Sequence, residues 1–128
     1  MSYTLDRLLQ DADMDTAETR ARAALMENGF GVLTEIDVAA TMKMKLDKDM
    51  PGYKILGACN PTMAFEAIGL EPKLGAMLPC NVILRAVDGG VEVSAVDPVA
   101  SMMGIDNTEL PRVATAVRDM LQKAVDEI

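Results

Sequence analysis

The sequence predicts an α+β fold, a two-layer sandwich in which helices pack on one face of a mainly antiparallel sheet of about four to five strands. Segments that alternate apolar and polar residues interleave with segments of helical spacing, without the regular strand-helix-strand order of parallel sheets. The tripeptide Asp88-Gly89-Gly90 joins two alternating segments, as in an antiparallel hairpin. With 128 residues, half of them hydrophobic, the chain is expected to form a single domain over residues 1–128.

The chain is predicted to begin with a short strand and a helix. Residues 3–9 alternate in polarity and indicate the strand. Asp15 is the expected N-cap of the helix, Glu18 follows it three residues later, and Gly29 ends the helix. Its apolar face repeats at helical spacing and consists of Ala17, Ala21, Ala24 and Leu25.

A second strand and a second helix follow. Residues 30–38 alternate and predict a half-buried strand, with Val32, Thr34 and Ile36 on one face. Asp37 is the expected N-cap of the next helix, which the sequence Met50-Pro51-Gly52 interrupts. Its inward face is expected to comprise Ala39, Met42 and Leu46, and its solvated face Lys43, Lys45 and Lys48.

The second half of the chain begins with a strand over residues 53–58 and a helix that Asn60 and Pro61 start. Two prolines and two glycines in residues 69–79 predict an irregular loop, and residues 80–87 and 91–96 form the hairpin strands. A helical turn after Asp97-Pro98 precedes the last helix, which starts near Thr108. The apolar stripe of that helix is Leu110, Val113, Val117, Leu121, Ala124 and Ile128.

Composition restricts the function. A net charge of -8 and an aromatic content of 3% argue against nucleic acid as a partner. The absence of histidine excludes Ser-His-Asp, Cys-His and histidine-zinc chemistry. No apolar run is long enough for a membrane span and the first ten residues do not resemble a signal peptide, so this acidic protein is expected in the cytoplasm, away from membranes.

The only two cysteines occupy similar stretches, GACNP at 57–61 and LPCNV at 78–82. Cys59 ends a predicted strand beside a helix N-terminus, where the helix dipole would lower a thiol pKa, and Cys80 begins another strand. If these strands are antiparallel neighbours, the two free thiols meet. The pair then reads either as small buried hydrophobes, which we favour, or as facing thiols that cycle through a disulfide or hold a soft cation.

Five further residues around the cysteines are candidates for ligand binding. Asn60 is expected to cap its helix, Pro61 to follow it, and Asn81 to need an exposed face or a partner. Gly75 and Pro79 read as backbone requirements of the irregular loop, which is still the best place for a binding surface. A separate methionine group reads as core or dimer interface more than as a copper site: Met42, Met44, Met50, Met102 and Met103. No metal-ligand set is predicted, and the cofactor stays unknown.

The stretches GFGVLTEIDVAATMK, YKILGACNP, LGAMLPCNV and VSAVDP resemble, in order and spacing, the family catalogued as domain of unknown function 302. The resemblance implies a compact α+β fold, TATA-binding-protein-like in shape, and commonly a homodimer, in bacteria and archaea. That likeness of shape does not imply DNA binding. The family's recurrent positions correspond to Gly29, Phe30, Gly31, Asp37, Cys59, Asn60, Pro61, Gly75, Pro79, Cys80, Asp97 and Pro98. The family assigns no activity, so none of these carries a role.

These observations favour a small homodimeric binding or interaction module with any chemistry centred on Cys59 and Cys80. One alternative is a thiol-dependent redox or sulfur-metabolism enzyme, with Cys59 as nucleophile and Cys80 as resolving thiol. A second is a soft-metal binder. A third is a small-molecule sensor with a pocket between sheet and helices.

Overall fold

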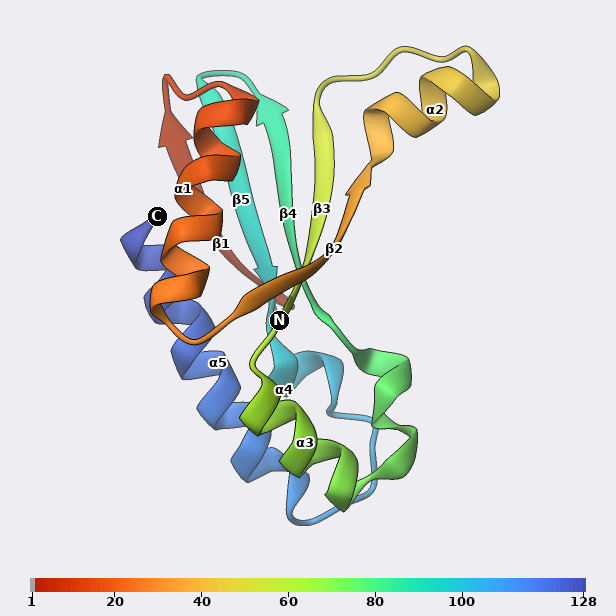
Figure 1. The fold of residues 1–128 in the computed structure, drawn as a ribbon, viewed down its shortest axis with the longest axis vertical. Helices are drawn as coiled ribbons and strands as arrows, with labels where there is room; N and C mark the ends of the chain where they lie inside the picture. The colour runs from red at the N-terminus through yellow and green to blue at the C-terminus, as the bar shows by residue number, and fades with distance from the viewer. Residues whose placement is uncertain (1) are drawn as a thin grey trace.

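The computed structural model describes residues 2–128 and has two layers, a twisted sheet and helices (Figure 1). The strands are β1 (Thr4–Gln10), β2 (Gly31–Asp37), β3 (Tyr53–Cys59), β4 (Cys80–Val87) and β5 (Gly90–Val96). Their order in the sheet is β1-β5-β4-β3-β2, and every neighbouring pair is antiparallel. The predicted α+β class and the strand number are confirmed.

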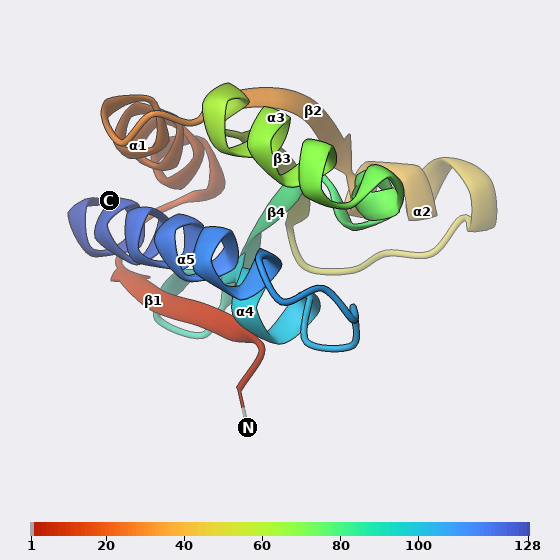
Figure 2. The same ribbon diagram turned by 90° about the horizontal axis from the view of Figure 1, so that it is seen from below.

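The helices are α1 (Met14–Glu27), α2 (Val38–Leu46), α3 (Pro61–Leu70), α4 (Pro98–Ser101) and α5 (Leu110–Glu127). A 3-10 helix, η1 (Pro72–Met77), occupies part of the segment predicted to be an irregular loop. Helices α1 and α5 lie side by side over one face of the sheet, while α3 packs beside the N-terminal half of α5 (Figures 1 and 2). We call the opposite face of the sheet, which α1 and α5 leave uncovered, the open face.

The core lies between the sheet and the pair α1 and α5. Leu56 and Leu84 from the sheet and Leu121 from α5 have no exposed surface, and burial of each such side chain contributes about 1.5–3 kcal/mol of transfer free energy. The predicted stripe of α5 is buried along its whole length, from Leu110 to Ile128. The long helix is therefore held to the sheet by the face that its periodicity indicates.

The hairpin between β4 and β5 is confirmed. Val87 pairs with Gly90, and both Gly89 and Gly90 have positive φ angles. A Cβ atom at Gly90 would collide with the carbonyl oxygen of Leu9 in β1. Glycine is therefore required there by the turn and by the close approach of the next strand.

The N-cap of α1 is Asp13, and the prediction of Asp15 is wrong. The Asp13 side chain accepts a hydrogen bond from the Thr16 N–H at 2.8 Å, which also lowers the pKa of that carboxyl. Three aspartates alternate in this region, and the turn that leaves β1 at Asp11, which has a φ of 60°, sets where the helix begins. Local spacing alone could not choose between them.

Strand β2 does not alternate along its whole length, so the predicted face of Val32, Thr34 and Ile36 is wrong. A bulge lies between Val32 and Thr34, which moves Thr34 and Ile36 to the open face and leaves Val32 on the helix side. Glu35 then also points to the helix side. As an edge strand with one hydrogen-bonded neighbour, β2 is mostly exposed instead of half-buried.

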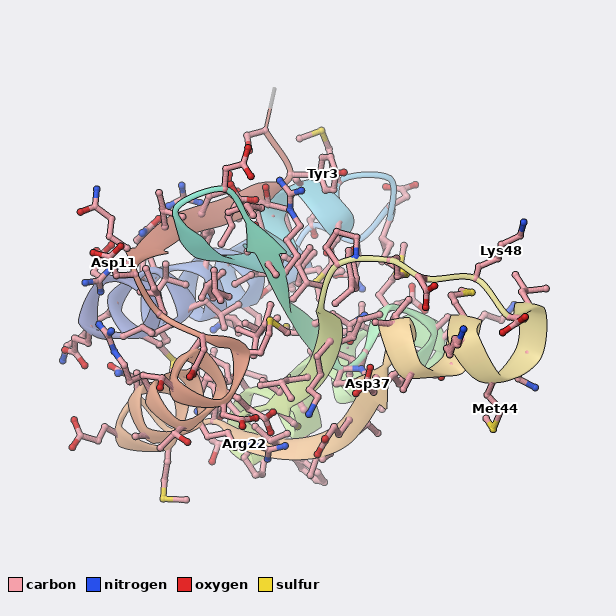
Figure 3. The ribbon with its side chains drawn as sticks, turned by 90° about the horizontal axis from the view of Figure 1, so that it is seen from above. Tyr3, Asp11, Arg22, Asp37, Met44 and Lys48 are labelled. Atoms are coloured by element: carbon pink, nitrogen blue, oxygen red, sulfur yellow. The ribbon has the colours of Figure 1, made fainter. Side chains whose placement is uncertain are left out.

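Helix α2 starts as predicted, because Asp37 accepts a hydrogen bond from the Ala40 N–H at 2.9 Å. The predicted inward face is right only in part: Ala39 and Met42 are half-buried, whereas Leu46 is 61% exposed, and no residue of α2 is fully buried. Helix α2 projects from the sheet on the side away from α1 and α5 (Figures 2 and 3). Periodicity identified an apolar face, and within residues 2–128 only the first half of that face, next to β3, is partly covered.

Candidate functional site

Both cysteines lie at the same end of the sheet. Cys59 is the last residue of β3 and Cys80 is the first residue of β4. The strands are antiparallel neighbours in which Ala58 pairs with Cys80, so Cys59 lies one position beyond the partner of Cys80. The hydrogen-bond register of the sheet therefore brings the two thiols into one neighbourhood, although twenty residues separate them in the sequence.

The two thiols differ in burial. Cys80 is 6% exposed, whereas Cys59 is partly exposed. Burial, with a smaller contribution from the adjacent Cys59, raises the pKa of the Cys80 thiol to about 11. At neutral pH Cys80 is therefore a protonated thiol and a poor nucleophile.

A small apolar pocket of about 30 Å³ is lined by both cysteine residues. We call it the thiol pocket. It lies where the ends of β3 and β4 meet α3 and α5, and its lining is Phe30, Ala58, Cys59, Asn60, Met63, Ala64, Ala67, Leu78, Cys80, Met102, Val113, Ala114 and Val117. The two cysteines are the only titratable residues in this lining, which also includes two methionines.

The predicted start of α3 is confirmed and forms one side of the thiol pocket. Asn60 accepts a hydrogen bond from the Met63 N–H at 3.0 Å, and Pro61 occupies the first turn. The residue that caps α3 therefore also lines the pocket, at the junction of β3 and α3. Cys59 lies directly before this cap.

The other candidate residues lie elsewhere. Pro79 follows a cis peptide bond, and Asn81 is on the open face opposite Gly57. Both line a second hollow, of about 450 Å³, on that face of the sheet. Pro61 and Gly75 line neither space. The structure thus groups Cys59, Asn60 and Cys80, and places Pro79 and Asn81 on the other side of the sheet.

Sequence reasoning missed the hollow on the open face. Its wall includes Tyr3, Tyr53, Met77 and Ser94, and the chain has no other tyrosines. Ser94 is 4% exposed although it points to the uncovered side of β5. The strand alternation places Ser94 and Val96 on one face and could have indicated this surface, but nothing local indicated that both tyrosines would lie on it.

A group of ion pairs at the β2 edge was also missed. Lys54 donates to Glu18 at 2.7 Å and to Glu35 at 2.8 Å, and Arg22 contacts the same two carboxylates at 2.9 and 2.8 Å. The hydrogen bond with Lys54 lowers the pKa of Glu18, and the two carboxylates raise the pKa of Lys54. The bulge in β2 makes this group because it turns Glu35 toward α1. Its role is to tie α1 to the sheet edge.

The fold and site define a class, an α+β protein with an open five-stranded antiparallel sheet and a thiol-lined apolar pocket at one sheet end. The family described as Domain of unknown function DUF302 matches residues 7–128, and the chain belongs to that family. The resemblance drawn from the sequence is therefore confirmed.

A solved structure has the same fold, "Crystal structure of uncharacterized conserved protein DUF302 from Bacillus stearothermophilus". Its TM-score is 0.92 at 20% identity, and the match covers 99% of this chain and 98% of that chain. No curated protein matches the chain. Within residues 2–128, no helix is both long enough and apolar enough to cross a bilayer.

Proposed function

We propose that the protein is a homodimeric, cytoplasmic binding module whose ligand site is the thiol pocket. The observation that carries this function is that both cysteines line one apolar space, with Cys59 partly exposed and Cys80 buried. The pocket offers dispersion contacts and soft sulfur atoms, and it contains no carboxylate or amine to act as a general acid or base. Such a lining favours the binding of a small apolar or sulfur-containing group.

The same features disfavour the thiol-dependent enzyme. A resolving thiol must attack as a thiolate, and the raised pKa of Cys80 keeps it protonated at neutral pH. Two reduced thiols that differ in burial fit a binding surface in a reducing compartment. They fit less well a catalytic dithiol that alternates between the reduced and the disulfide form.

The test uses methionine methyl groups as reporters. In protein labelled with ¹³C at the methionine methyls, ethanethiol is added and the resonances are followed by NMR. The methyls of Met63 and Met102, which line the thiol pocket, are expected to shift saturably, while that of Met26, which is 76% exposed on α1, stays in place.

The matched control is Ala64→Leu, which fills the thiol pocket with a larger side chain from α3 and leaves both cysteines in place. The substitution is expected to abolish the shifts of Met63 and Met102. If the two methyls do not respond to ethanethiol in the unsubstituted protein, or respond equally with Leu at position 64, the thiol pocket is not the ligand site.

A second candidate function, soft-metal binding, is favoured by the number of sulfur side chains around the pocket: Cys59, Cys80, Met63 and Met102. Thiolate and thioether sulfur select Cu(I). Within residues 2–128, no three His, Cys, Asp or Glu side chains lie close enough to hold an ion, so thioethers would complete the coordination. Binding would displace the Cys80 proton.

Competition of the protein with a chromophoric Cu(I) chelator tests this candidate. Stoichiometric Cu(I) uptake that is lost in both Cys59→Ala and Cys80→Ala, with no comparable uptake of Zn(II), would support it. Equal uptake by the wild-type protein and by both single variants would refute it.

A further inference from the structure

The α2 arm, which we define as residues 38–50, contains no fully buried residue. Every residue from 43 to 50 is exposed, including Met44 at 78% and Leu46 at 61%. Figure 3 shows Met44 and Lys48 projecting into solvent from the free end of the arm, far from the helices at the other side of the sheet. An isolated helix shorter than about 12 residues is marginal in water, so a nine-residue helix whose residues are at most half-buried would gain stability from a further surface.

The open face is the second unpartnered surface of the chain. Its residues form rows across the strands, since Asp6 pairs with Ser94, Ser94 with Ile83, and Ile83 with Ile55. The hollow of about 450 Å³ lies in these rows beside Tyr3 and Tyr53. An apolar floor with a concave centre is a surface onto which a short helix can pack.

The α2 arm and the open face together contain most of the exposed large hydrophobic side chains of residues 2–128, seven of twelve. The seven are Tyr3, Leu8, Ile36, Met44, Leu46, Met50 and Met77. Their exposed fractions run from 38% to 78%, so together they leave an apolar area on the order of the roughly 800 Å² that each partner buries in a standard interface. The two surfaces are therefore large enough, together, for one stable dimer interface.

Charge also matches between the two surfaces. Three of the twelve basic residues lie within residues 43–48, and two of them, Lys45 and Lys48, form no ion pair within residues 2–128. On the open face, Asp6 forms no ion pair there either, and Glu92 uses only its Oε1 atom, which Arg85 contacts at 2.9 Å. The arm thus has two lysines without an ion pair within residues 2–128, and the open face has carboxylate oxygens without one.

We propose that the α2 arm of one chain packs on the open face of a second copy of the same chain, and that the second copy returns the contact. This inference rests on the homodimer of the proposed function, and it specifies which surfaces form the dimer interface. Arm and open face lie on the same side of the sheet (Figures 2 and 3), so a single two-fold rotation brings both contacts together. In that dimer Met44 and Leu46 are buried, and Lys45 and Lys48 lie near Asp6 and Glu92 of the partner copy.

The test compares paired variants by sedimentation velocity across micromolar concentrations. The wild-type protein is expected to be a dimer, and Met44→Asp with Leu46→Asp is expected to weaken the dimer at least a hundredfold. The matched control, Met26→Asp with Phe65→Asp, changes two side chains that are 76% and 84% exposed on α1 and α3, and it is expected to leave the dimer unchanged.

A charge reversal separates a specific contact from general damage. Lys45→Glu with Lys48→Glu is expected to weaken the dimer about tenfold. Adding Asp6→Lys to that double variant is expected to restore most of the loss, because opposite charges again face each other across the two-fold axis.

Each outcome has a distinct meaning. A wild-type dimer that the arm variants leave intact would overturn the arm surface and leave the homodimer standing. A wild-type monomer would overturn both proposals, and the open face would then be free for a small molecule or another protein. Failure of Asp6→Lys to rescue the charge reversal would overturn the placement of the lysines near Asp6.

Discussion

The difference in reactivity between the two cysteines is the sharpest consequence of the site. Burial raises the pKa of the Cys80 thiol from 9.0 to about 11. At pH 7 this lowers its thiolate fraction from about 1% to about 0.01%, so alkylation of Cys80 should be at least a hundredfold slower than in the unfolded chain. Exclusion of reagent by the thiol pocket slows it further.

The assay uses single-cysteine proteins. In Cys59→Ala the only remaining thiol is Cys80, and its alkylation by iodoacetamide is followed by mass spectrometry in native buffer and in denaturant. In Cys80→Ala the partly exposed Cys59 reports an accessible thiol in the same fold. We expect Cys59 to react readily and Cys80 to react only at high pH or through opening of the structure.

The raised pKa also predicts a pH dependence of stability. The native state retains the Cys80 proton up to a higher pH than the unfolded chain does, so this contribution is complete below pH 9 and is lost as pH rises toward 11. Two pKa units correspond to about 2.7 kcal/mol. Native Cys80 that reacts at pH 7 as fast as it does in denaturant would refute the reasoning on burial and on the thiol pocket alike.

Two further predictions concern the sheet and its edge. Gly57→Ala should destabilise the protein by about 1–3 kcal/mol in denaturant melts, because the new Cβ would collide with the Thr34 hydroxyl. The control is Gly69→Ala in α3, which has open space around it and should be neutral or stabilising by up to about 1 kcal/mol. Equal effects of the two substitutions would contradict the packing at Gly57. Glu18→Gln should cost about 1 kcal/mol at pH 7 by removing the carboxylate that Lys54 contacts. Since the pKa of Glu18 is lowered in the native state, that loss should shrink as pH falls below 4.5, and a loss independent of pH would exclude the ion pair as its cause.

Local chemistry in the sequence was sufficient for most of the fold. Asp37 and Asn60 cap helices, and the alternation in residues 80–96 with its glycine turn forms a hairpin. These signals act between residues that are close in the chain, so they can be read without knowing the rest of the molecule. The predictions were wrong where a contact with a distant part of the chain determines the local structure, as at the Asp13 cap and at the bulge of β2.

For the site, the sequence indicated the two cysteines but not the residues that surround them in the fold. The similar GACNP and LPCNV stretches pointed to Cys59 and Cys80 at strand ends. Only the pairing of β3 with β4 placed the two thiols together, and only the packing of α3 and α5 closed an apolar wall around them. The hollow beside the two tyrosines also depends on strands that are far apart in sequence.

By itself, the amino-acid sequence determined the periodicities, caps and turns, because these follow from backbone geometry and from neighbouring side chains. The tertiary structure decided which apolar faces found a partner. The stripe of α5 is buried along its whole length, whereas the apolar face of α2 is at most half-buried. Burial depends on what lies opposite a helix and not on the helix itself.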